Sequence, residues 1–84
     1  MTAQNLKLTL EAARHNAGYS QSEAAARLNV HPQTLASWER DSSKLSYIEA
    51  NKLAELYGVS TDVLFFGLKN EFIRSLRKQA AKTS

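Results

Sequence analysis

The stretch SQSEAAARLNVHPQTLASWER, residues 20–40, decides how this chain of 84 residues is organised. Ser20 is followed three residues later by Glu23, which is the spacing of a capping box at the start of a helix. Asn29 tolerates the left-handed backbone conformation, and Pro32 suits the first position of a helix because its missing N–H costs little there. The stretch therefore predicts two short helices joined by a tight turn.

The second of these helices has one apolar side and one polar side. Leu35 and Trp38 form the apolar side. The polar side consists of Gln33, Thr34, Ser37 and Arg40. A major groove admits one α-helix, and a glutamine amide there can pair with adenine while serine and threonine hydroxyls serve several bases. Polar helix faces are more often simply solvated, so the residues around this helix have to decide between the two interpretations.

Further short helices are expected on both sides of this pair. They cover residues 6–17, 47–57, 61–66 and 69–80. Gly18 and Gly58 stand where left-handed helix stops belong, and Ser46 and Ser60 stand at N-cap positions. We therefore expect an all-α fold, a compact bundle of five to six short helices with a central helix-turn-helix, in a single domain of residues 1–84.

Composition excludes several kinds of protein. The chain has no cysteine, which removes disulfides, thiolate catalysis and cysteine zinc sites. Its longest apolar run, residues 63–66, is far too short to span a membrane, and its N-terminal residues lack a signal-peptide layout. We therefore expect a cytoplasmic protein with no membrane partner.

Catalytic and metal-binding patterns are missing from the sequence. His15 and His31 lack the spacing of metal ligands, no nucleophile is paired with a base, and no glycine-rich loop is suited to a phosphate. We expect no enzyme activity, no metal and no cofactor.

The net charge of +3 is unevenly distributed. Residues 69–84 carry a net charge of +4, whereas residues 1–68 carry −1. A basic chain suggests an anionic partner. Because the excess of positive charge lies in the C-terminal tail, net charge alone is weak evidence for DNA binding. The tail is either solvated or an additional phosphate-binding segment.

Three motifs make the chain resemble the lambda-repressor and Cro (XRE-type) helix-turn-helix family. They are Ser20-Gln21, Trp38-Glu39 and the ending GVSTDVL at residues 58–64, all at the family's separations. The resemblance covers roughly residues 6–67 and leaves residues 68–84 as a C-terminal helix and basic tail. It implies a transcriptional regulator that binds duplex DNA through the major groove.

The resemblance also implies roles for individual residues. Those expected to lie against base edges are Pro32, Gln33, Thr34 and Ser37. Gln21, at the start of the second helix, is expected to bond a phosphate or a flanking base. Arg40, at the end of the reading helix, and Lys44, in the loop after it, are expected on phosphates. Arg14 and Glu39 match an ion pair that ties the first helix to the third. His31 either contacts a phosphate or caps the reading helix.

The chain departs from the family pattern in the loop after the reading helix. The family usually has glycine where Asp41 stands and proline where Leu45 stands. Aspartate is able to adopt the left-handed conformation, but its charge would repel a nearby phosphate. Pro32 also stands where the family commonly has a polar base-reading residue, so it offers apolar contact only.

An apolar stripe near the C-terminus has two interpretations. In one, the last helix folds back and completes the monomer core, with Phe65 pointing inward. In the other, the stripe forms a two-fold dimer interface. The residues assigned to that interface are Phe66, Phe72, Ile73 and Leu76. We expect both interpretations to apply in part. We also expect a homodimer that represses transcription from an inverted-repeat operator.

Two other functions stay open. An antitoxin would bind its own promoter and mask a second protein with the aromatic C-terminal surface. A protein-interaction module would have kept the fold and lost DNA binding, which the near-neutral body of the chain and Asp41 favour mildly.

Overall fold

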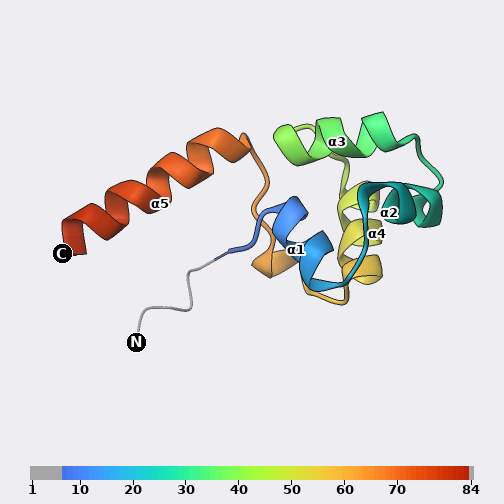
Figure 1. Cartoon of the computed structure of the whole chain (residues 1–84), viewed down its shortest axis with the longest axis horizontal. Helices are drawn as coiled ribbons and strands as arrows, with labels where there is room; N and C mark the ends of the chain where they lie inside the picture. The colour runs from blue at the N-terminus through green and yellow to red at the C-terminus, as the bar shows by residue number, and fades with distance from the viewer. Residues whose placement is uncertain (1–6, 84) are drawn as a thin grey trace.

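The computed structural model describes the backbone of residues 7–83 and the side chains of residues 7–78. Its elements are α1 (Leu10–Asn16), α2 (Gln21–Leu28), α3 (Pro32–Arg40), α4 (Tyr47–Tyr57), the 3-10 turn η2 (Thr61–Val63) and α5 (Lys69–Thr83). Helices α1 to α4 pack together, and α5 extends away from them (Figure 1). The predicted all-α class is confirmed. None of the helices within residues 7–83 is long and apolar enough to cross a membrane.

Side-chain caps define where the helices begin. Ser20 and Glu23 form a full capping box on α2, with Glu23 N donating to Ser20 Oγ at 3.1 Å and Ser20 N to Glu23 Oε1 at 2.9 Å. Thr9 caps α1 by accepting from Ala12 N at 3.0 Å. The first helix was expected to start near residue 6, but α1 begins only after Thr9, so residues 7–9 are not helical as expected. Leu6 lies outside the described residues.

The core is made by leucines from four segments. The largest fully buried side chains are Leu10, Leu35, Leu53 and Leu64. Burying one leucine contributes about 1.5–3 kcal/mol. Ala24 and Ala25 of α2 are also fully buried, and their small size lets α2 approach its neighbours α3 and α4 closely.

The expected helix over residues 61–66 is wrong, since only the turn η2 forms. Leu64 is extended and makes a parallel bridge with Leu8. Leu8 N donates to Val63 O at 2.7 Å, and Phe65 N donates to Leu8 O at 2.8 Å. Pairing with the segment before α1 takes the backbone groups that would otherwise continue the helix.

Helix α5 does not fold back along the bundle. The expectation that the last helix completes the monomer core is therefore wrong beyond the first turn of α5. Its N-terminal end is held by an ion pair between Lys69 Nζ and Glu11 Oε1 at 2.8 Å and by the ring of Phe72, which stacks on the half-buried Phe65 with centroids 4.3 Å apart. The rest of α5 projects from the bundle (Figure 1), and the molecule measures 43 × 23 × 23 Å.

Candidate nucleic-acid interface

Helix α3, the predicted reading helix, turns its polar residues to solvent and its apolar residues to the core. Gln33, Ser37 and Arg40 are exposed and lie four and three residues apart, so they share one helix face. Thr34 and Pro32 are also exposed beside this face. Leu35 is fully buried and Trp38 packs against the core from a half-buried position.

Arg40 is the last residue of α3, in agreement with its expected place on the polar side of this helix. The helix ends directly after it, because Asp41 turns into extended backbone. Arg40 therefore extends the polar face that begins with Gln33. Its guanidinium stands at the C-terminal end of that face, next to the loop that holds the exposed Lys44.

His31 is the N-cap of α3. Its Nδ1 atom accepts a hydrogen bond from Gln33 N at 3.0 Å. A neutral imidazole that accepts at one nitrogen carries its proton on the other. The exposed His31 side chain therefore caps the helix with Nδ1 and offers Nε2–H as a donor to solvent or to a ligand.

A buried carboxylate joins the first three helices. Glu39 Oε2 accepts from Arg14 Nε at 2.6 Å, and Glu39 Oε1 accepts from Arg14 Nη2 at 3.3 Å. Arg14 Nη1 also donates to Tyr19 O at 2.9 Å. The hydrogen bond to Glu39 raises the pKa of the Arg14 guanidinium above its usual range. This pair holds the end of α3 against α1, so it positions the reading face without being part of it.

Gln21, the first residue of α2, takes part in the same network. Its Nε2 donates to Glu39 Oε1 at 2.9 Å. An amide nitrogen has two hydrogens, so one N–H of Gln21 stays available for a phosphate. The backbone N–H groups of Gln21 and Ser22, which the capping box does not use, have no acceptor within the helix either. The Glu23 carboxylate of the capping box lies at the same helix end, and its charge opposes an anion there.

The loop after α3 takes a shape that the sequence did not indicate. Asp41 is extended, with φ −150°, and its carboxylate accepts from Ser43 N at 3.0 Å. A hydrogen bond from the Ser43 side chain, together with the one from its backbone N–H, lowers the pKa of Asp41 below its ordinary value. The left-handed conformation considered for Asp41 is therefore not used. The neighbouring Ser42 is buried and bonded to Gly67, which lies just before α5. No local sequence pattern predicts this contact.

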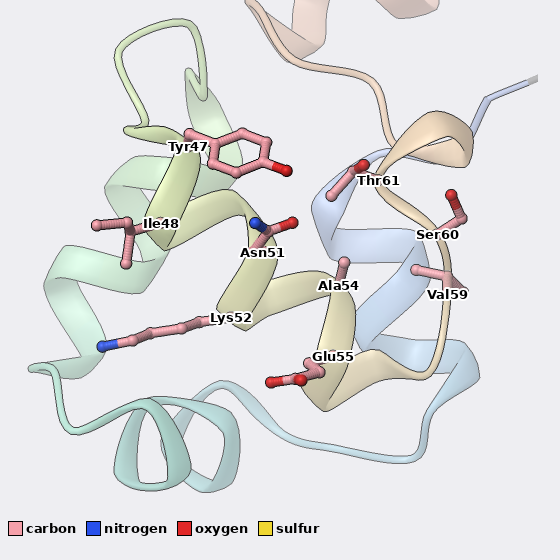
Figure 2. Close-up of a pocket in the computed structure, with 9 residues that line it drawn as sticks. All are labelled: Tyr47, Ile48, Asn51, Lys52, Ala54, Glu55, Val59, Ser60 and Thr61. Carbon is pink, nitrogen blue, oxygen red and sulfur yellow. The ribbon is translucent and has the colours of Figure 1, made fainter.

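An open hollow of about 530 Å³ lies on a different part of the surface, beside α4 (Figure 2). It runs from the start of α4 to the segment after Gly58, with Asn51, Val59 and Thr61 among its lining residues. Tyr47 and Ile48 at its rim are 78% and 67% exposed. None of the residues expected to contact DNA lines this hollow.

Comparison with known proteins places this geometry in a family. The helix-turn-helix family model matches residues 10–64. This chain belongs to the XRE-type helix-turn-helix family. The HTH-type transcriptional regulator ImmR of Bacillus subtilis (strain 168) is 46% identical to it over 55 residues, which cover 66% of this chain and 43% of that protein. The chain thus spans less than half the length of this relative. No solved structure matches with significance.

The part of the chain that matches the XRE-type family coincides with its packed core. Leu10 and Leu64, at the two ends of the match, are both almost fully buried. The helix-turn-helix unit of α2 and α3 lies wholly inside the match, whereas α5 lies outside it. Family membership therefore accounts for α1 to α4, while α5 has to be interpreted from its own contacts.

Proposed function

We propose that this chain is a sequence-specific, DNA-binding transcriptional regulator that inserts α3 into the major groove. The observation that carries the proposal is the exposed polar face formed by Gln33, Ser37 and Arg40. The opposite side of the same helix packs against the core through Leu35 and Trp38. Helix-turn-helix proteins present such a face to base edges. The similarity to a protein named as a transcriptional regulator supports the same function.

The residues proposed to contact bases lie between Pro32 and Ser37 of α3. The Gln33 amide is suited to adenine, and the Ser37 hydroxyl to several bases. Thr34 offers a hydroxyl and a methyl group at the edge of the face, and Pro32 offers apolar contact only. With few hydrogen-bonding side chains, we expect strong preference at a small number of base pairs in each half-site.

The residues proposed to bind phosphates lie at both ends of this face. Arg40 and Lys44 supply positive charge at the C-terminal end of α3, and His31 Nε2–H and the free N–H of Gln21 supply neutral donors at the other end. Contacts of this kind position a protein on DNA without reading its sequence.

A homodimer is the form we propose for binding. The stripe of Phe72, Ile73 and Leu76 runs along one side of α5, and Phe66 precedes it with 37% of its surface exposed. The other side of α5 is basic, with Arg74, Arg77 and Lys78 exposed. Pairing two such stripes would place the reading helices on an inverted repeat with half-site centres about 34 Å apart. Occupying an operator in this way would repress transcription.

The test is selection of binding sites from a random duplex library at two salt concentrations. Enrichment of an inverted repeat, with affinity that falls steeply as salt rises, is the expected result. Enrichment of single half-sites would remove the dimer from the proposal and leave DNA reading in place. No enrichment at either salt concentration would contradict the proposal as a whole.

An antitoxin-type autoregulator is the second candidate, because α5 projects from the bundle and its apolar stripe is accessible to a different protein (Figure 1). The two candidates differ in what α5 contacts. Analytical ultracentrifugation of the purified chain tests the homodimer, which should be lost in Leu76→Asp. Co-purification of an unrelated small protein, lost in the same variant, would favour the antitoxin.

A further inference from the structure

The reading helix and the projecting helix are joined by a short pairing of two segments. Ser42 lies two residues after the end of α3, and Gly67 lies two residues before the start of α5. Ser42 N donates to Gly67 O at 2.9 Å, and Gly67 N donates to Ser42 Oγ at 2.9 Å. Both polar groups of Gly67 are therefore bonded to one residue whose surface is only 4% exposed.

The pairing extends to the next residue on each side. Asp41 and Leu68 form an antiparallel bridge directly beside the Ser42–Gly67 contact. Asp41 is the C-cap of α3, and Leu68 accepts at its carbonyl from Phe72 N in the first turn of α5, at 3.1 Å. The backbone is therefore restrained continuously from the last turn of α3 to the first turn of α5.

An aromatic stack lies against the same junction. Gly67 has a φ of 153°, and a Cβ atom there would lie 2.7 Å from Cζ of the Phe65 ring. That ring is stacked on Phe72 of α5 at an interplanar angle of 22°. The close approach of the ring to the Gly67 backbone leaves the stack little room to shift.

We infer that Ser42 is a positioning residue that holds α5 at a fixed angle to α3 and thereby sets the half-site spacing that the dimer accepts. The inference rests on the proposed function, in which α3 reads DNA and α5 pairs two protomers. Two-fold symmetry doubles any change of angle between these helices. One base pair of spacing corresponds to about 3.4 Å and about 35° of rotation along the duplex, so a small change at the junction alters which spacing fits.

The experiment uses the half-site selected from the random library. Duplexes carry one copy, or two inverted copies at the selected spacing and at one and two base pairs more or less. Wild type, Ser42→Ala and the matched control Ser43→Ala are titrated by fluorescence anisotropy. Ser43 is exposed, and its side chain and backbone N–H both bond to Asp41 and not to Gly67. Its variant leaves the Ser42–Gly67 pairing intact and should keep the spacing preference of wild type.

Ser42→Ala is expected to bind a single half-site as wild type does. Its preference for the selected spacing over the adjacent ones should fall at least about threefold, the size expected when the hydrogen bond of one buried hydroxyl is lost. Gly67→Ala, which displaces the Phe65 ring instead, should flatten the preference in the same way. It also serves as the test if circular dichroism shows that Ser42→Ala is unfolded.

Other outcomes overturn the inference. If Ser42→Ala or a folded Gly67→Ala weakens binding at every spacing by one factor, the junction is structural only and does not set spacing. An unchanged preference in both variants leads to the same conclusion while the proposed dimer stands. A wild-type protein that selects no repeat contradicts the proposed dimer, and this inference with it.

Discussion

Arg14 of α1 and Glu39 of α3 form a buried ion pair, with Arg14 Nε 2.6 Å from Glu39 Oε2. Gln21 of α2 donates to the same carboxylate, so the Glu39 side chain joins α3 to both α1 and α2. A buried pair of this kind adds little net stability compared with a well-packed apolar pair, but the loss of one partner leaves an uncompensated charge. Its structural role is to hold the end of α3 in one place.

Removing one partner of this pair should be strongly destabilising. We expect Arg14→Met to lower the free energy of unfolding by about 3 kcal/mol, because the Glu39 carboxylate then stays buried without its cation. Urea denaturation measures the change. The double variant Arg14→Met/Glu39→Leu should recover part of the loss, and the exposed Lys52→Met is the control. A loss no larger than that of the control would show that the pair is solvated.

Gln33→Ala should change the sequence that is read. If the amide pairs with one base, its loss should cost about 1–3 kcal/mol on the selected site and relax the preference at one position in each half-site. Repeating the selection with the variant measures both effects. A uniform loss of affinity with the same selected sequence would place Gln33 off the base edges.

Arg40→Ala should weaken binding to all sequences alike. A lost phosphate contact is expected to leave the selected sequence unchanged and to reduce the slope of log affinity against log salt by about one. Titrations at several salt concentrations provide the slope. Because Arg40 shares a helix face with Gln33 and Ser37, a changed base preference would assign it to the bases instead.

The hydroxyl of Tyr57 offers a test of the core. It is buried, and it has no hydrogen-bond partner among the described side chains. Burial raises the pKa of Tyr57 to about 12, from an ordinary value of 10.0. Because the folded state holds this proton more tightly, stability should be unaffected below pH 10 and should fall as the pH rises from 10 towards 12.

Tyr57→Phe should therefore do two things. It should raise the free energy of unfolding at neutral pH by about 1 kcal/mol, since an unsatisfied polar group leaves the core. It should also remove part of the fall in stability between pH 10 and 12. Thermal denaturation at a series of pH values measures both. A destabilised variant would mean that the hydroxyl has a partner in solution.

The anchoring of α5 should depend on acid pH. The hydrogen bond from Lys69 lowers the pKa of Glu11 below its ordinary value of 4.5. The pair should contribute fully above that value and should weaken as the pH falls through the lowered pKa. Amide hydrogen exchange in the first turn of α5 should speed up over that window. In Glu11→Gln the exchange should be faster from the start and lack this step; a step that survives would come from another group.

Much of the local structure followed from short-range patterns. The capping boxes at Ser20 and Ser46, the left-handed Asn29 and the stop at Gly58 all appear where the sequence indicated them. Each depends on backbone groups within three or four residues, so neighbouring residues are enough to predict it.

Predictions failed where distant segments compete for the same backbone. The pattern at residues 61–66 is helical, but Leu64 pairs with Leu8 across 56 residues and ends the turn. The start of the first helix shifted for the same reason. The sequence did not single out Ser42, because its partner Gly67 lies 25 residues away and no local pattern predicts that contact.

The sequence by itself determined the family, the helix-turn-helix and the polar face of α3, because periodicity and caps are local properties of the chain. The tertiary structure decided where Arg14, Gln21 and Glu39 meet, how the loop at Asp41 is shaped and in which direction α5 leaves the bundle. These features depend on hydrogen bonds and packing between residues far apart in the chain, and their geometry exists only once the helices have docked.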